Sequence, residues 1–163
     1  CRSAGKISLL AGLGTGFTGH LTGRENAFLY GSILGHEQAV MKELMNEIIS
    51  FSELESFIDE PLRTYSAGMK ARLGLAVASA LNPEILLIDE VLGVGDPVFK
   101  EKSKEKILHM VSEAGTVVIV SHSFGLMTSI CDRVIHMSDG EIKFIGDPQE
   151  AISSYYASEE GRK

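Results

Sequence analysis

The chain of 163 residues is 44% hydrophobic, a length and composition that allow one domain with a sizeable core. Its net charge of −7 argues against a protein that binds the phosphate backbone of nucleic acids, so we expect no nucleic-acid partner. Cys1 and Cys131 have no metal-ligand spacing, no signal peptide opens the chain, and no apolar stretch approaches the roughly 20 residues that cross a bilayer, so we expect a soluble protein with reduced thiols.

The first half of the sequence predicts a mostly helical segment. Thr22 and Glu25 form a capping box, in which the threonine caps the helix and the glutamate reaches back to the threonine backbone. Ser52 and Glu55 have the same spacing, and Ser66 caps a helix that an Asn-Pro pair ends. The expected elements are a strand at 7–10 and helices at about 22–34, 37–49, 52–60 and 66–81.

The second half alternates strands with helices. Residues 85–88 are a continuous apolar run, typical of a strand buried on both faces in a parallel sheet, and residues 117–120 predict a second buried strand. Asp96 and Pro97 are an N-cap and a first-turn proline, so they begin a helix that ends at Gly115. Two further helices are expected at 124–130 and 148–157, with a hairpin between them at 133–137 and 141–145.

Two adjacent carboxylates, Asp89 and Glu90, follow the apolar run at 85–88. In an open α/β sheet the ligand site lies beyond the carboxyl ends of the strands. A carboxylate there can hold Mg²⁺, and the next can polarise a water for attack on phosphorus. The alternative is a pair of solvated acids at the end of a strand.

His122 follows the second apolar strand, so we expect it at the same sheet edge as the two acids. A neutral imidazole there can donate a hydrogen bond to a phosphate oxygen or hold the attacking water. The alternative is a histidine with only a structural role.

A serine cap and small residues begin the helix at Ser66. Free backbone N–H groups and the helix dipole make such an N-terminus a site for anions. An ordinary capped helix explains the same pattern when it is taken alone. Arg63, Lys70 and Arg72 lie nearby in the sequence, and they predict either a local basic patch or a solvated helix face.

The order and spacing of these features resemble the ABC ATPase family. Tyr65–Met69 is similar to the signature motif, Asp89 and Glu90 to the Walker B aspartate and catalytic glutamate, residues 94–96 to the D-loop, and His122 to the switch histidine. The resemblance implies an α/β, RecA-like P-loop NTPase fold with a helical subdomain. It divides residues 1–163 into a helical and signature subdomain at 18–82 and a part of the catalytic core at 83–163.

A narrower resemblance is to the ATPases of teichoic-acid, O-antigen and capsular polysaccharide exporters. It rests on residues 13–17, 21–26, 65–70 and 93–96. The resemblance implies an ATP-hydrolysing subunit that exports a polysaccharide or lipid-linked glycan. It also implies a homodimer of ATPase domains, a transmembrane permease partner, and a cytoplasmic, peripheral place on the inner face of the membrane.

Each site residue takes an expected role from the family. Ser66, Ala67, Gly68 and Met69 would bind the γ-phosphate of an ATP held by the partner domain, Asp89 would support Mg²⁺, Glu90 would polarise the water, His122 would sense the γ-phosphate, and Asp96 would bridge the two subunits.

The sequence departs from the family at two motifs. The Walker A pattern, Gly-x-x-x-x-Gly-Lys-Ser/Thr, has no match, because Gly5-Lys6 is followed by Ile7 and reads as a turn at a strand edge. Gly12 and Leu13 occupy the Q-loop region and offer no side chain for Mg²⁺. We interpret the chain as an N-terminally incomplete domain that is inactive alone. The alternatives are a degenerate module that lends only its signature face and a soluble ABC ATPase that acts on nucleic acid or ribosomes.

Overall fold

The computed structural model describes residues 7–10, 13–14, 16–89 and 96–160. These residues form two compact units, which are divided between Val120 and Ser121. The predicted boundary between a helical subdomain and a catalytic core, after residue 82, lies inside the first unit and stays a prediction. None of the described helices is both long and apolar enough to cross a membrane.

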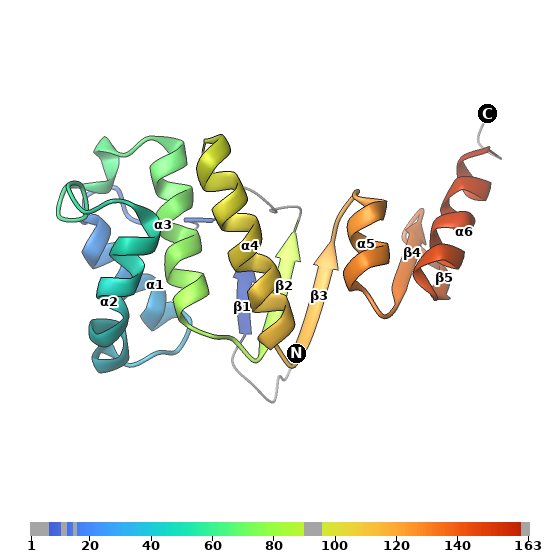
Figure 1. The fold of residues 1–163 in the computed structure, drawn as a ribbon, viewed down its shortest axis with the longest axis horizontal. Coiled ribbons are helices and arrows are strands. Elements are labelled where there is room, and N and C mark those ends of the chain that lie inside the picture. Colours follow the sequence, from blue (N-terminus) through green and yellow to red (C-terminus); the bar gives the residue numbers. More distant parts are fainter. Residues whose placement is uncertain (1–6, 11–12, 15, 90–95, 161–163) are drawn as a thin grey trace. The chain divides into compact units, whose positions relative to one another are not determined.

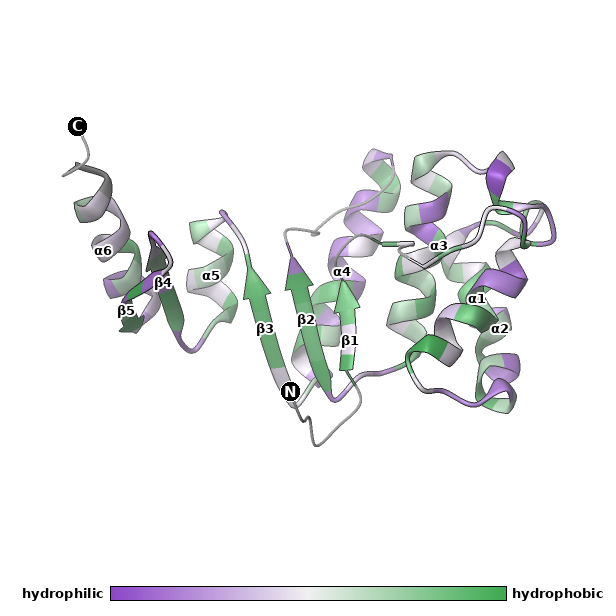
Figure 2. Ribbon diagram, turned by 180° about the vertical axis from the view of Figure 1, so that it is seen from behind, coloured by the Kyte–Doolittle hydropathy of each residue, from purple (hydrophilic) through white to green (hydrophobic). Residues whose placement is uncertain are grey.

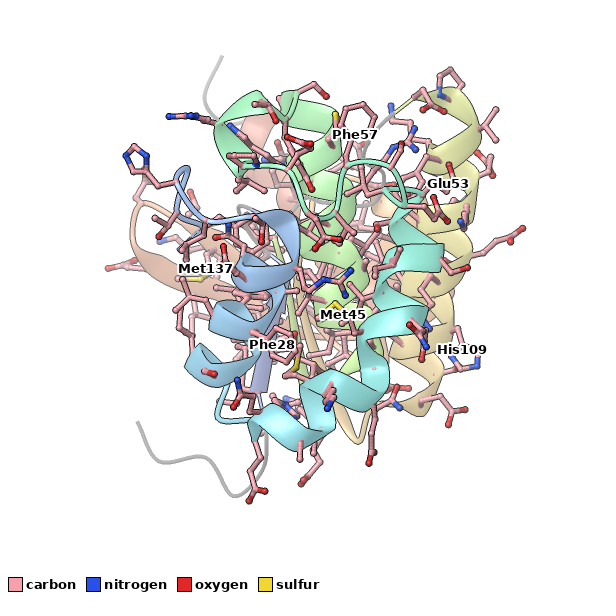
Figure 3. All side chains as sticks on the ribbon, turned by 90° about the vertical axis from the view of Figure 1, so that its left-hand side faces the viewer. Phe28, Met45, Glu53, Phe57, His109 and Met137 are labelled. Carbon is pink, nitrogen blue, oxygen red and sulfur yellow. The ribbon has the colours of Figure 1, made fainter. Side chains whose placement is uncertain are left out.

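Three helices lie together at one end of the first unit (Figure 1). They are α1 (Gly23–Ile33), α2 (Gln38–Ser52) and α3 (Ala67–Ala80), with a short 3₁₀ helix at Leu62–Thr64 before α3. The predicted capping box of α1 is confirmed, because Thr22 Oγ1 accepts from the Glu25 N–H at 3.1 Å and the Thr22 N–H donates to Glu25 Oε2 at 2.8 Å. Their core includes Met45, which is labelled in Figure 3 and is 4% exposed.

The sheet of the first unit has three parallel strands in the order β1 (Ile7–Leu10), β2 (Ile85–Asp89) and β3 (Thr116–Val120). Helix α4 (Pro97–Glu113) lies across one face of this sheet (Figure 1). The parallel order places the carboxyl ends of all three strands at one edge, with Asp89 opposite Val120. The sequence predicted this arrangement of β2, α4 and β3 correctly.

The other face of the sheet carries exposed apolar side chains, and Figure 2 shows these strands with no helix in front of them. Leu9 is 44% exposed, Val118 53% and Val120 59%, whereas Leu86 and Ile88 on the α4 side are buried. The prediction that residues 85–88 and 117–120 are buried on both faces is therefore wrong for this structure. The apolar runs correctly predicted strands. Whether one face or both faces of a strand are covered depends on other segments of the chain.

The predicted helix at 52–60 is also wrong. Ser52 is the last residue of α2 and is fully buried, and its hydroxyl donates to the Ile49 backbone oxygen at 3.0 Å, so it caps nothing. Glu53 then ends α2 in a left-handed conformation with φ of 56°. Helix α2 extends beyond the predicted end because Phe51 packs against the core and Ser52 is buried in it. The same spacing of a hydroxyl residue and a glutamate thus begins a helix at Thr22 but not at Ser52.

The second unit contains a β-hairpin and two helices. They are α5 (Phe124–Ile130), β4 (Val134–Ser138), β5 (Glu141–Gly146) and α6 (Pro148–Glu160). The hairpin turn at Asp139 and Gly140 has φ angles of 54° and 78°, the left-handed conformation that two-residue hairpin turns require. His136 is 7% exposed, and its Nδ1 lies 3.0 Å from Ser154 Oγ on α6. The sequence predicted every element of this unit.

Candidate functional site

The N-terminus of α3 has the geometry that the sequence predicted. Ser66 is the N-cap, and its Oγ accepts a hydrogen bond from the Met69 N–H at 3.1 Å. Ser66 and Ala67 are exposed, and Gly68 is half-buried, so solvent reaches the first turn. The first N–H groups of a helix have no partner within the helix, and the helix dipole adds partial positive charge there. This end of α3 can therefore receive an anion.

A hollow of about 440 Å³ lies beside this N-terminus, and we call it the α3–α4 hollow. It is lined by Glu53, Leu54, Phe57, Ser66, Gly68, Met69, Arg72 and Asp96. Figure 3 labels Glu53 and Phe57, which lie at its rim in the segment that follows α2. The structure therefore brings together four of the predicted site residues: Ser66, Gly68, Met69 and Asp96.

Asp96 caps α4, as the sequence predicted. Its Oδ1 accepts from the backbone N–H groups of Val98 and Phe99, each at 3.1 Å, and its second oxygen pairs with Arg72. The hydrogen bond from the Phe99 N–H lowers the pKa of the carboxyl below its usual value, and the charge of Arg72 lowers it further. Asp96 is thus held in its ionised form at the edge of the hollow.

Asp89 lies at the carboxyl end of β2, where its side chain is exposed. The described residues contain no group of three or more acidic, histidine or cysteine side chains that could hold a metal. A single carboxylate is still compatible with Mg²⁺, because Mg²⁺ keeps several waters and uses one or two carboxylates together with phosphate oxygens. The residues present fit an ion that a nucleotide brings with it, with Asp89 as the protein ligand.

The remaining predicted site residues are Glu90 and His122. His122 belongs to the second unit, so its approach to Asp89 stays a prediction. Glu90 and the 94–95 part of the D-loop lie outside the described residues, as do Gly5, Lys6 and Gly12.

Two charged lining residues, Glu53 and Arg72, were missed as members of the site, as were the apolar Leu54 and Phe57. Arg72 was expected either in a basic patch or on a solvated helix face, yet its side chain is 18% exposed and pairs with two acids. Those acids are 19 and 24 residues away in the sequence, and no local pattern reports pairs at such separations. Glu53 lies between Ser52 and Glu55, the two residues of the predicted capping box, so it was expected inside a short helix and not at the end of α2.

A family model described as "ABC transporter" matches residues 3–93, which is more than half of the chain. The chain belongs to the ABC transporter family. The predicted α/β P-loop NTPase fold is confirmed by solved members of this family. One of them, the dimeric structure of an ATP-binding cassette in a post-hydrolysis state bound to ADP and Pi, is 25% identical and has a TM-score of 0.62 over 88% of this chain and 63% of its own.

Curated relatives of this ABC transporter chain include the exporters that the narrower resemblance named. It is 44% identical to an O-antigen export ATP-binding protein of Myxococcus xanthus, over 93% of this chain and 35% of the relative. It is 42% identical to a teichoic acids export ATP-binding protein of Lactococcus lactis, over 93% of this chain and 32% of the relative. The chain thus spans about a third of the length of these two relatives.

Proposed function

We propose that this chain is the signature-bearing part of an ATPase subunit that powers the export of a polysaccharide or lipid-linked glycan. The observation that carries the proposal is the α3–α4 hollow, in which the capped N-terminus of α3 lies beside Asp96. The names of the two export relatives support the substrate class. Such a subunit hydrolyses ATP to ADP and phosphate in the complete protein.

In this proposal the first turn of α3 binds the γ-phosphate of an ATP that the partner domain holds. The Ser66 hydroxyl and the N–H groups of Ala67 and Gly68 are the donors, and the dipole of α3 favours the negative charge. The Met69 N–H donates to Ser66 Oγ and so orients this hydroxyl. In the proposal this chain alone binds no nucleotide, because the first turn of α3 contacts only the γ-phosphate. A second copy of the domain therefore completes each site.

Asp89, Glu90 and His122 supply the hydrolytic chemistry in this proposal. Mg²⁺, when bound, neutralises charge on the phosphates, and Asp89 is its protein ligand. Glu90 orients and polarises the attacking water, and His122 donates a hydrogen bond toward the γ-phosphate. In this proposal the ATPase subunit lies at the inner face of the cell membrane, where it contacts a transmembrane permease.

The test uses the complete protein that contains this chain. We expect Glu90→Gln to stop ATP hydrolysis and to trap ATP in a closed dimer, measured by phosphate release and by analytical ultracentrifugation with ATP. The matched control is Glu113→Gln, an exposed glutamate at the end of α4, which we expect to hydrolyse ATP normally. A normal rate for Glu90→Gln would contradict the role of Glu90. The alternative, a degenerate module that only lends its signature face, predicts that the complete protein binds no ATP.

A further inference from the structure

Arg72 lies on the second turn of α3, and its guanidinium has three partners, Glu53, Asp96 and the ring of Phe99. One terminal nitrogen donates to Glu53 Oε2 at 2.9 Å, and the other pairs with the carboxylate of Asp96. The plane of the guanidinium lies over the ring of Phe99, with 4.5 Å from its central carbon to the ring centroid. A planar cation with diverging donors suits this arrangement, whereas a lysine ammonium offers a single centre and no plane to stack.

Arg72 connects three segments that meet at the α3–α4 hollow. Glu53 is the left-handed residue that ends α2, and Asp96 is the residue that begins α4. Glu53 also accepts from Lys102 Nζ of α4 at 2.8 Å, and this hydrogen bond lowers the pKa of the Glu53 carboxyl. The end of α2 is thus tied to α4 directly through Lys102 and indirectly through Arg72.

Both carboxylate oxygens of Asp96 are used within this chain. Oδ1 accepts from two backbone N–H groups of α4, and the other oxygen pairs with Arg72. The role expected for Asp96 from the family resemblance was a bridge between two subunits. That bridge stays a prediction, and within this chain the carboxylate fixes the start of α4 against the signature helix.

We propose that Arg72 is a positioning residue that holds Asp96 and Glu53 in place around the N-terminus of α3. The effect of Arg72 on nucleotide chemistry rests on the proposed function, because Arg72 acts through the N-terminus of α3, which contacts the γ-phosphate in that proposal. Without Arg72 the first turn of α4 and the end of α2 lose their common partner, and the hollow loses its fixed shape.

Ion pairs at a protein surface are often worth little, so the degree of burial decides whether Arg72 matters. The side chain of Arg72 is 18% exposed, whereas Arg24, which pairs with Asp59 at 2.7 Å, is 38% exposed beside an acid that is 68% exposed. Arg24 is therefore the matched control: it is an arginine of the same unit in a bidentate ion pair that solvent screens.

The first experiment measures backbone hydrogen exchange in the complete protein. We expect Arg72→Met to speed exchange at Val98 and Phe99 about tenfold, as loss of a hydrogen bond to a charged group implies, and Arg72→Lys to restore only part of the protection. Arg24→Met leaves the exchange at these two residues unchanged. Unchanged exchange at Val98 and Phe99 in Arg72→Met would overturn the proposal.

The second experiment measures ATP-driven dimerisation in a Glu90→Gln background. We expect Arg72→Met to weaken ATP-driven dimerisation about tenfold. The ATP affinity of the monomer is expected to stay the same, because the N-terminus of α3 contacts only the ATP that the partner domain holds. Asp96→Asn, which keeps the N-cap but removes the charge, is expected to give a similar loss, and the double variant is expected to be no worse than either single variant. A lowered melting temperature with normal dimerisation would reduce Arg72 to a structural residue and overturn the proposal.

The two experiments also separate this proposal from the proposed function. If the Glu90→Gln protein with native Arg72 fails to dimerise with ATP, the proposed function fails. Hydrogen exchange at Val98 and Phe99 still decides whether Arg72 positions α4.

Discussion

The hydroxyl of Tyr65 donates a hydrogen bond of 2.5 Å to the backbone oxygen of Phe57. Tyr65 directly precedes the Ser66 cap and is 5% exposed, so this bond anchors the chain just before the signature helix begins. The same hydroxyl lies so close to Gly23 that a Cβ there would be 2.3 Å from it. The start of α1, the turn after α2 and the start of α3 therefore meet at one tyrosine.

Tyr65→Phe removes this hydroxyl and leaves the Phe57 carbonyl with one donor, the backbone N–H of Glu60 at 2.8 Å. We expect the free energy of unfolding to fall by about 1 kcal/mol, the net contribution of one intramolecular hydrogen bond. Urea denaturation followed by circular dichroism measures it. A change within about 0.5 kcal/mol, as for an ordinary surface substitution, would show that water replaces the hydroxyl.

Tyr65 also gives the protein a pH dependence at alkaline pH. Burial, with the nearby charges of Asp59 and Glu60, raises the pKa of Tyr65 to about 12. In the unfolded chain a tyrosine releases its proton near pH 10, so between about pH 10 and 12 the unfolded state binds fewer protons and stability falls as pH rises. We expect the stability advantage of the native protein over Tyr65→Phe to shrink across this window. An advantage that stays constant from pH 9 to pH 12 would contradict the raised pKa.

Gly74 and Gly125 both lie in helices but have opposite surroundings. A Cβ at Gly74 would meet the Gly14 backbone nitrogen at 2.7 Å and the Leu13 carbonyl carbon at 3.1 Å, whereas a Cβ at Gly125 would meet nothing within 4 Å. We expect Gly74→Ala to destabilise by about 1–3 kcal/mol, because α3 and this backbone must separate. Gly125→Ala is expected to be neutral or to stabilise by up to about 1 kcal/mol, because alanine favours a helix. Thermal unfolding measures both, and equal effects would refute the close approach at Gly74.

Local signals in the sequence predicted most of the fold. Caps such as Thr22 and Asp96 act over three residues, and the hairpin turn at Asp139 and Gly140 has a composition that permits few other conformations. Such features depend on neighbours along the chain, so a single sequence reveals them. The capped N-terminus of α3 and the carboxylate at the end of β2 were predictable for the same reason.

Features that depend on distant partners were not predictable. The pairing of Arg72 with Glu53 and Asp96 joins residues separated by 19 and 24 positions, and only the packing of α2, α3 and α4 brings them together. Ser52 had the spacing of a cap, but burial of its side chain in the core decided its role. The exposed face of the sheet, which includes Val118, was unpredictable for the same reason. Whether a face of a strand is covered depends on other segments of the chain and not on the residues of the strand.

Asn26 is fully buried, and its side-chain amide both accepts and donates hydrogen bonds. Its Oδ1 accepts from the Thr18 N–H at 2.7 Å, and its Nδ2 donates to the backbone oxygens of Thr18, Leu21 and Thr22. Asn26→Asp has nearly the same shape but places a carboxylate against carbonyl oxygens, and we expect a loss of about 3–5 kcal/mol, as for an uncompensated buried charge. The matched control is Asn46→Asp on the exposed face of α2, expected within about 0.5 kcal/mol of the native protein. Chemical denaturation measures the difference, and similar stabilities would contradict the buried network.

Ser66 has two proposed roles, as the cap of α3 and as a donor to the γ-phosphate, and one pair of variants separates them. Asparagine and aspartate are both good N-caps, so Ser66→Asn and Ser66→Asp are each expected to preserve the hydrogen bond from the Met69 N–H and the stability of the protein. They differ in charge, because an amide can donate to a phosphate whereas a carboxylate repels it.

We expect ATP hydrolysis by the complete Ser66→Asp protein to fall about a hundredfold below that of Ser66→Asn, since a like charge at this position costs a few kcal/mol. Phosphate release at saturating ATP measures it, with melting temperatures as the control for folding. Equal rates in the two variants would place the γ-phosphate away from the N-terminus of α3, whereas a lower melting temperature in Ser66→Asp alone would assign the loss to the cap.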